Sequence, residues 1–326
     1  MRVLVTGATG YVGSRLIPEL LSRGHDVAAT FHRDPRPAYP WDRDVAWRRV
    51  NVLDLRDVVT AAGGVDAVVY LVHGLEEADF KATDREAAEN MRDALDHAGV
   101  KRVVYLSGII PDIPRGDLSE HLDSRLEVEE ILAGSHASAL SLRAAIIIGS
   151  GSTSFEIVRQ ISENLPLVQT IPSWMRHTTV QPVAIADAVY YLAQAVEQPE
   201  VTGHIDIAGP DRLTYPELLS LYAEVAGLRR VQLPIPGLPA DVVGIVAGQL
   251  TDVDTGTVES LMSSLRDDMV AQGEARTQLG DPDRATLGAR QAIVRARQIF
   301  GMAPDGAAVG GDPAAPSAGD PAWSRT

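Results

Sequence analysis

Short apolar runs alternate with longer amphipathic stretches along the first 150 residues. The apolar runs predict β-strands at residues 2–6, 25–31, 67–72, 102–106 and 140–148. Between them, apolar residues recur every three or four positions, and the clearest predicted helices span residues 79–98 and 118–133. Alternating strands and helices predict βαβ units and an α/β fold with a doubly wound parallel sheet. Such sheets bind ligands at the carboxyl ends of their strands.

This alternation weakens in the second half of the chain, where loops rich in Ser, Pro and Gly appear. We therefore expect residues 1–150 to form the parallel-sheet domain, to which 178–210 returns. Residues 151–177 and 211–300 are expected to form a smaller, substrate-facing part. Residues 301–326 are mostly Gly, Ala, Pro and Asp, which offer little apolar surface to offset the entropy of ordering, so they predict a disordered tail.

Charge and cysteine content exclude several classes of protein. The 326 residues include 29 basic and 44 acidic side chains, and the resulting net charge of -15 repels phosphate backbones, so we expect no nucleic-acid partner. The chain has no cysteine, which excludes disulfides, thiolate metal sites and a cysteine nucleophile. Absence of cysteine also fits a reducing compartment, and we expect a cytoplasmic protein. His136, His177 and His204 lack ligand spacing, so no metal is expected.

Membrane association and assembly are less constrained by the sequence. No apolar run approaches the roughly 20 residues of a spanning helix, so we expect no membrane span. The apolar stretch 233–250 is interrupted by prolines and predicts a loop and a buried helix, with contact to a membrane surface as the alternative. A monomer and a homodimer are both compatible with the sequence.

A glycine-rich turn lies directly between the first predicted strand and the helix that follows it. Its sequence TGATGYVG comprises Thr6, Gly7, Ala8, Thr9, Gly10, Tyr11, Val12 and Gly13. Gly7 permits a tight turn, Gly10 allows a pyrophosphate to approach the backbone, and Gly13 allows close packing of helix on strand. The helix N-terminus adds unpaired N–H groups and a positive dipole. The turn predicts a dinucleotide site.

This octapeptide resembles the short-chain dehydrogenase/reductase superfamily, whose extended and atypical branches carry TGxxGxxG at this place. The segments VNVLD at 50–54, KRVVYLSG at 101–108 and the turn at Gly209 and Pro210 extend the resemblance, which is closest to the atypical, NmrA-like group of NAD(P)-binding proteins. The resemblance implies a Rossmann domain over residues 1–150. It also implies cofactor contacts at four further positions, Asn51, Val52, Leu71 and Val72.

The end of the second predicted strand bears on the choice of dinucleotide. An acidic residue there would hold the ribose 2′-OH of NAD, whereas an arginine would accept the 2′-phosphate of NADP. The sequence reads Phe31-His32-Arg33 and has no acidic residue there, so we expect the protein to bind NADP in preference to NAD. Arg33 is the expected partner of the 2′-phosphate, and Arg15 is a further candidate. The alternative is that Arg33 is an ordinary surface arginine beside Asp34.

The catalytic tyrosine and lysine implied by the resemblance are absent. The matching segment reads His121-Leu122-Asp123-Ser124-Arg125, so His121 and Arg125 occupy the places of the YxxxK pair and share a helix face. Histidine titrates near neutrality and could donate a proton, or it could merely close the pocket. His73 is a second candidate donor, with a pocket-wall role as its alternative. Ser107 could orient a substrate carbonyl or satisfy the backbone at the strand end.

Two functions follow from this combination of an intact turn and an altered pair. The first is an NADP(H)-dependent oxidoreductase of a small carbonyl, enone or quinone-like substrate. The second is a non-catalytic NADP(H)-binding redox sensor or accessory protein, which loss of both tyrosine and lysine favours. An epimerase or dehydratase would retain the tyrosine and therefore ranks last.

Overall fold

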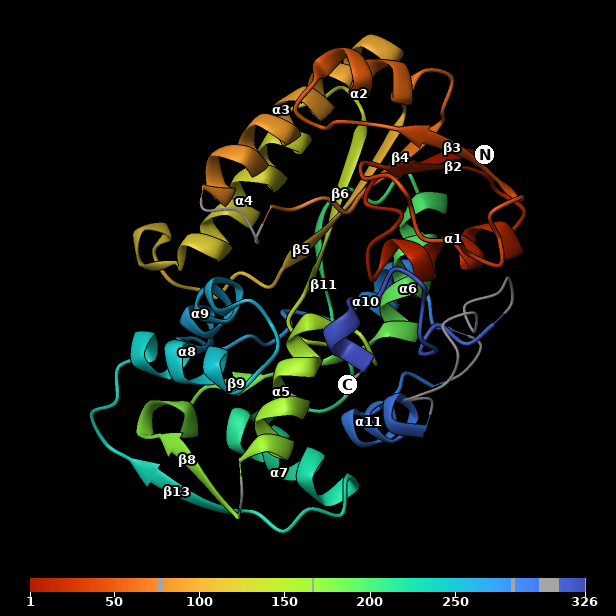
Figure 1. Cartoon of the computed structure of the whole chain (residues 1–326). Helices are drawn as coiled ribbons and strands as arrows, with labels where there is room; N and C mark the ends of the chain where they lie inside the picture. The colour runs from red at the N-terminus through yellow and green to blue at the C-terminus, as the bar shows by residue number, and fades with distance from the viewer. Residues whose placement is uncertain (75–78, 166, 283–284, 299–310, 326) are drawn as a thin grey trace.

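A seven-stranded parallel sheet forms the centre of the molecule (Figure 1). The computed structural model describes residues 1–74, 79–165, 167–282, 285–298 and 311–325. The strand order is β11-β6-β5-β4-β1-β2-β3. Strands β2 and β3 extend the sheet to one side of β1, and β4 and the later strands of this sheet extend it to the other side. The strands are β1 (Arg2–Val5), β2 (Asp26–Phe31), β3 (Val45–Arg49), β4 (Ala67–Tyr70), β5 (Arg102–Gly108), β6 (Ser138–Ala144) and β11 (Gly203–Ile207). The predicted α/β fold is confirmed.

Helices cover both faces of this sheet because its central strands are apolar on both sides. In β1, Val3 and Val5 join one core while Leu4 joins the other. The first core lies under α1 (Gly13–Ser22), α6 (Ile185–Glu197) and α10 (Ala275–Leu279). The second lies under α2 (Leu55–Ala62), α3 (Phe80–Ala98) and α4 (Glu120–Ala133). In Figure 1 these helices flank the sheet on opposite sides.

The remaining elements build a third core beyond the carboxyl ends of the strands. Its helices are α5 (Thr153–Asn164), α7 (Tyr215–Val225), α8 (Ala240–Gln249), α9 (Thr255–Ser263) and α11 (Ala289–Gln298), with the short helices η2 (Ser173–Arg176) and η3 (Ser264–Arg266). Three two-stranded sheets, β10-β7, β12-β9 and β13-β8, connect them. Their strands are β7 (Ile147–Ile148), β8 (Val168–Pro172), β9 (Thr179–Val180), β10 (Val183–Ala184), β12 (Leu213–Thr214) and β13 (Val231–Ile235).

The C-terminal segment 311–325 differs from the disorder that we expected for residues 301–326. It packs against α1 and ends in the short helix η4 (Ala322–Arg325). Arg15, only 1% exposed, donates to both carboxylate oxygens of Asp320 at 2.7 Å and to the carbonyls of Pro313 and Ala315. A buried ion pair thus orders a segment with few large apolar side chains. Residues 299–310 and 326 lie outside the described residues.

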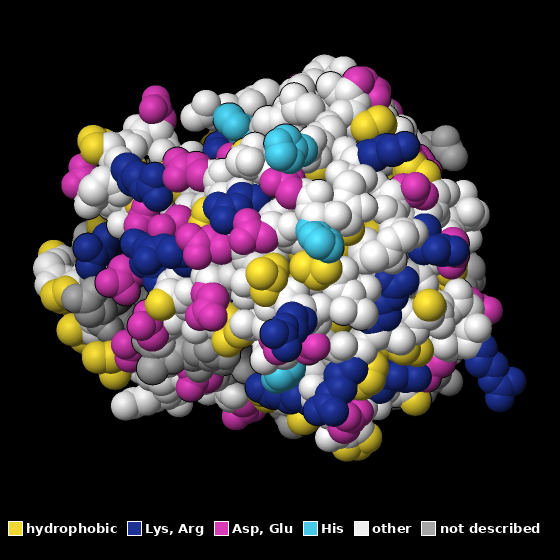
Figure 2. Space-filling model, turned by 90° about the horizontal axis from the view of Figure 1, so that it is seen from above, with side chains coloured by type: hydrophobic (Ala, Val, Ile, Leu, Met, Phe, Trp, Pro, Cys, Tyr) yellow, Lys and Arg dark blue, Asp and Glu magenta, His cyan; other side chains and the backbone are white. Residues whose placement is uncertain are grey.

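The outer surface mixes charges of both signs. Figure 2 shows acidic and basic side chains interleaved on the face that it presents. Between α3 and α4, Arg85 pairs with Glu127 at 2.7 Å, and Lys81 pairs with Asp123. Among the described helices, none is long and apolar enough to cross a membrane.

Candidate functional site

At two positions of the glycine turn between β1 and α1, the surrounding backbone lies too close to admit a residue with a Cβ atom. Gly7 has φ +66°, and a Cβ there would lie 3.0 Å from the carbonyl oxygen of Leu71. A Cβ on Gly13 would lie 2.3 Å from the carbonyl oxygen of Gly7. Thr6 and Ala8 are buried, and the Thr6 hydroxyl bonds the Val69 carbonyl at 3.3 Å, which ties the turn to β4. The turn therefore has a compact backbone conformation that depends on these glycines.

The N-terminus of α1 fits the diphosphate of a dinucleotide. Among the described residues, none accepts a hydrogen bond from the backbone N–H of Tyr11 or Val12. The first turn of α1 holds no acidic residue, and Val12 provides no side-chain cap. These N–H groups and the positive end of the helix dipole suit an anion. A dinucleotide held here would be contacted mainly through backbone.

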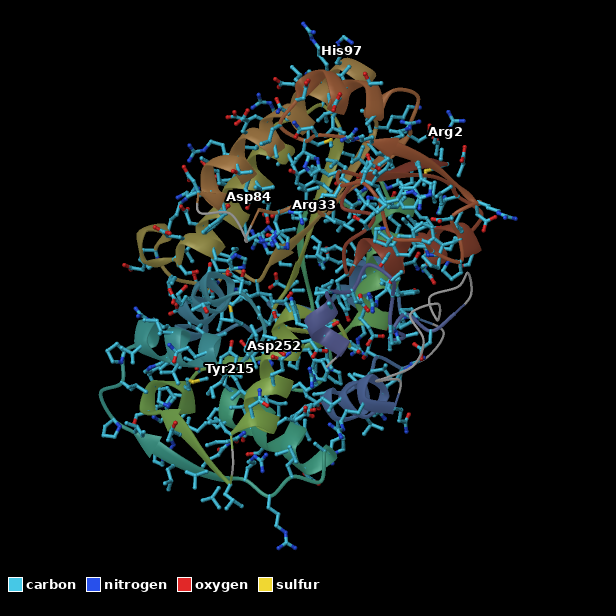
Figure 3. All side chains as sticks on the ribbon, viewed as in Figure 1. Arg2, Arg33, Asp84, His97, Tyr215 and Asp252 are labelled. Atoms are coloured by element: carbon cyan, nitrogen blue, oxygen red, sulfur yellow. The ribbon has the colours of Figure 1, made fainter. Side chains whose placement is uncertain are left out.

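The predicted adenine side lies at the neighbouring ends of β2 and β3. Phe31 accepts a hydrogen bond from the Val50 N–H at 2.9 Å, which brings Asn51 and Val52 beside the end of β2. Arg33 follows β2 and is exposed; it is labelled in Figure 3. Asp34 pairs with Arg49 at 3.6 Å. Arg33 is therefore an exposed cation just after β2, and its contact with a 2′-phosphate stays a prediction.

Arg15 does not qualify as the second phosphate partner that we considered. It is buried, its guanidinium is occupied by Asp320, and it stacks on the Tyr11 ring with 4.1 Å to the ring centroid. Because both ends of its fork are engaged, Arg15 holds the C-terminal segment instead. The position of Arg15 in the sequence, two residues after Gly13, does not indicate this contact with the other end of the chain.

One cleft brings the four predicted catalytic residues together at the carboxyl edge of the sheet. His73 follows β4, Ser107 lies in β5, and both His121 and Arg125 project from one face of α4. The cleft is also lined by Gly7, Gly10, Tyr11, Val12, Gly13, Leu71 and, from the C-terminal segment, Trp323. The other predicted cofactor residues, Thr6, Ala8, Thr9, Arg33, Asn51, Val52 and Val72, lie outside its described lining. The helix face predicted from HxxSR therefore points to the glycine turn.

A hydrogen-bonded scaffold holds α4 in this orientation. Ser124 donates to a carboxylate oxygen of Asp84 at 3.1 Å, and the other oxygen accepts the Gly74 N–H at 2.7 Å. Asp84, labelled in Figure 3, thus links α3, α4 and the end of β4. Arg125 donates to the Tyr105 hydroxyl at 3.2 Å. The roles of Tyr105 and Asp84 could not be predicted from the sequence, because their partners Arg125 and Ser124 lie on a different element of the fold.

The electrostatics of the cleft change the role expected for the histidines. Burial, aided by the positive charge of Arg125, lowers the pKa of His121 to about 3. His73 is exposed in the cleft, but the surrounding protein and then the charge of Arg125 hold its pKa well below the usual value. Both imidazoles are therefore neutral at pH 7. Our expectation that His121 titrates near neutrality is wrong for this structure, although a neutral imidazole still has an N–H to donate.

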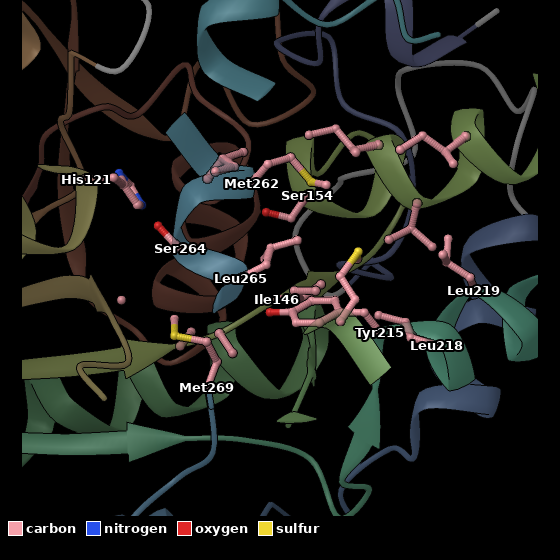
Figure 4. Close-up of a pocket in the computed structure, with 18 of the residues that line it drawn as sticks. His121, Ile146, Ser154, Tyr215, Leu218, Leu219, Met262, Ser264, Leu265 and Met269 are labelled. Carbon is pink, nitrogen blue, oxygen red and sulfur yellow. The ribbon is translucent and has the colours of Figure 1, made fainter. Parts of the chain in front are cut away.

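An apolar chamber, which no motif in the sequence predicts, adjoins the cleft. It is enclosed by side chains from α4, α5, η2, α7, α9 and η3, among them Ile157, Met175, Leu218 and Met262 (Figure 4). His121 and Ser154 line both the cleft and the chamber. A ligand in the chamber would therefore reach the cleft at His121.

Comparison with known proteins agrees with this site. Residues 7–160, which contain α4 and all of the turn except Thr6, match the model of an NAD(P)H-binding family. These residues, just under half of the chain, form an NAD(P)H-binding domain of that family, as expected for an atypical short-chain dehydrogenase/reductase-like protein. The resemblance seen in TGATGYVG is confirmed. The matched domain binds NAD(P) as a class, without distinguishing NADP from NAD.

Individual relatives are distant. The chain is 27% identical over 261 residues to a ceramide reductase of Caulobacter vibrioides, with 77% of each chain covered. It is 26% identical over 236 residues to an uncharacterized protein of Mycobacterium tuberculosis. That alignment covers 72% of this chain but 24% of the relative, so the chain spans about a quarter of that protein. A nucleoside-diphosphate-sugar epimerase from Staphylococcus aureus shares the fold, with TM-score 0.72, 13% identity and coverage of 90% and 100%.

Proposed function

We propose that the protein is an NADP(H)-dependent reductase of a small carbonyl, enone or quinone-like compound that has an apolar body. The observation that carries the proposal is the position of His121, which lines both the dinucleotide cleft and the apolar chamber. A substrate whose apolar part fills the chamber would present its polar end beside His121. The name of the Caulobacter relative, ceramide reductase, supports both the reaction class and an apolar substrate.

The residues of the cleft would bind and polarise the substrate oxygen. When bound, the nicotinamide supplies the hydride, so the protein needs chiefly to orient the two reactants. Neutral His121 would donate an N–H hydrogen bond to the substrate oxygen, and Ser107 would hold it from β5. Arg125 would stabilise the negative charge that develops there without itself titrating. Because neither imidazole is protonated at pH 7, water in the open cleft would supply the proton.

The proposal also includes the cofactor preference, the oligomeric state and the cellular location of the protein. Arg33 at the end of β2 would select the 2′-phosphate of NADP, with NAD as the weaker ligand. The protein would act as a monomer or homodimer on a small-molecule substrate, and the absence of cysteine suits the cytoplasm.

One observation favours a second function, a non-catalytic NADP(H) redox sensor or accessory protein. The pKa of His121, lowered to about 3, and the lowered pKa of His73 leave the cleft without a protonated imidazole at neutral pH. In a sensor, dinucleotide binding would only shift a conformational equilibrium.

A calorimetric titration followed by a turnover screen tests both functions. Purified protein is titrated with NADPH and NADH, and oxidation of NADPH is then followed with small apolar ketones, enones and quinones. Turnover that falls at least tenfold in His121→Ala, with unchanged NADPH affinity, would support the reductase. Binding of NADPH without turnover of any compound would favour the sensor, and absence of binding would refute both.

A further inference from the structure

We propose that Tyr215 determines substrate specificity by offering its hydroxyl to a hydrogen-bonding group on an otherwise apolar ligand. The inference rests on the proposed function, because it takes the occupant of the chamber to be the substrate. Tyr215 is the first residue of α7 and lines the chamber. In Figure 4 its hydroxyl end is directed to the side on which Leu265 and Met269 lie, rather than to the body of α7.

The Tyr215 hydroxyl is buried without a partner. The residue is 4% exposed, and its oxygen forms no hydrogen bond with any described residue. Burial, with a smaller contribution from nearby Asp268, raises the pKa of the phenol, so the hydroxyl stays neutral and able to donate. Buried hydroxyls are normally hydrogen-bonded, so the unpaired Tyr215 hydroxyl in the chamber wall can take its partner from the molecule that fills the chamber.

The other polar groups of the chamber are engaged or serve the cleft. The Ser264 hydroxyl is 2.8 Å from the Ser119 hydroxyl, which also caps α4. His121 and Ser154 lie at the border with the cleft. Tyr215 is therefore the buried hydroxyl in the described chamber wall that remains available to a ligand.

The backbone holds this hydroxyl in a fixed place. Thr214 and Glu217 form a capping box at the start of α7, and Pro216 follows Tyr215 in the first turn. Leu213 and Thr214 also pair with β9 in a short antiparallel sheet. A group anchored on both sides loses little entropy when it forms a hydrogen bond, so it can discriminate between similar ligands.

The size of the chamber limits the apolar group that it accepts. Its volume is about 110 Å³, and a dry apolar protein cavity of about 150 Å³ binds benzene. The chamber is smaller than that cavity but adjoins the cleft at His121 and Ser154, so it suits at most one small ring or a short branched alkyl group. We infer a ligand with such a group, carrying an oxygen or nitrogen that meets Tyr215.

The test uses two probes of the same shape, benzyl alcohol and ethylbenzene, which differ by a hydroxyl in place of a methyl group. Their affinities are measured by calorimetry on the full-length protein without dinucleotide. In Tyr215→Phe, the affinity ratio of benzyl alcohol to ethylbenzene should fall about fivefold to tenfold, the value of one neutral hydrogen bond. The thermal unfolding midpoint should stay the same or rise, because the variant removes an unpaired buried hydroxyl.

Two further variants separate a specific role from a structural one. Tyr222→Phe makes the same change on the same helix, but the Tyr222 hydroxyl contacts Glu163 and Arg297 outside the chamber, so the ratio should not change. Leu219→Phe narrows the chamber and should weaken both probes alike. If Tyr215→Phe folds poorly, the affinities of the two probes for Leu219→Phe still show whether the probes occupy the chamber.

An unchanged ratio in Tyr215→Phe, or probe binding that Leu219→Phe does not weaken, would overturn the proposal. So would failure of both probes to bind the wild-type protein. Because the probes are measured without dinucleotide, a failed turnover screen leaves this result standing, and the two failures are distinguishable.

Discussion

The glycine turn and the apolar chamber lie on either side of His121 but are built in different ways. Residues 6–13 form the turn from one continuous segment, and its bonds to Val69 and Leu71 only fasten it to β4. The chamber is assembled from α4, α5, α7, α9 and two short helices that are far apart in the sequence. A local motif therefore specifies the predicted dinucleotide half, whereas tertiary packing specifies the half that we propose for the substrate.

The C-terminal segment makes this division less simple. It comes from the far end of the chain, yet it packs on the glycine-turn side through Arg15 and contributes Trp323 to the cleft. The dinucleotide half thus also depends on contacts with a segment from the far end of the chain. Variants in each half would show how far it depends on local and on distant residues.

We expect the largest effect from Asp320→Asn, which removes the charge that neutralises buried Arg15. An uncompensated buried charge costs about 3–5 kcal/mol of stability. Chemical denaturation should show this loss, and it should persist with NADPH present. The control is Asp312→Asn, whose pair with Arg295 is exposed by 32% and 37%; it should cost less than about 1 kcal/mol. Equal losses in both variants would show that the segment does not stabilise the turn.

A smaller loss should follow from Gly13→Ala, which tests the local part of the site. The added Cβ would lie 2.3 Å from the Gly7 carbonyl oxygen, so the turn must open. Such overpacking costs about 1–3 kcal/mol, and titration calorimetry should show at least a tenfold loss of NADPH affinity. Gly116→Ala is the matched control, because a Cβ there meets nothing within 4 Å. Retained NADPH affinity in Gly13→Ala would contradict the closed geometry of the turn.

The contrast between the halves explains what could be predicted from the sequence. Strand and helix periodicity gave the sheet, and TGATGYVG with HxxSR gave the residues that meet in the cleft, because each motif lies within one strand–turn–helix unit. The role of Tyr105 and the existence of the chamber could not be predicted, because the residues that meet there come from separate elements of the fold. The role of Asp320 could not be predicted for another reason. Composition indicates how little apolar surface a segment can bury, but it does not indicate that one of its carboxylates will pair with a buried arginine.

The pH dependence of stability should reveal the shielding of His121. Its pKa is about 3 in the folded protein against an ordinary 6.5. Between these values the unfolded chain binds more protons, so stability falls as pH drops from about 6.5 toward 3. Denaturation at pH 7 and pH 4 should show wild type losing about 1–2 kcal/mol more than His121→Gln, after allowance for partial exposure. Equal losses would mean that Arg125 and burial do not hold this imidazole neutral.

The smallest effect should come from Arg33→Ser, which tests a single exposed contact of the dinucleotide half. Loss of one charge-assisted interaction with a 2′-phosphate should lower NADPH affinity about tenfold, or about 1.4 kcal/mol, and leave NADH affinity unchanged. Arg49→Ser removes a nearby arginine that pairs with Asp34 and should change neither affinity. A parallel fall for both dinucleotides would assign Arg33 to the general binding surface. Selection between NADP and NAD would then depend on backbone geometry at the end of β2, which local sequence does not reveal.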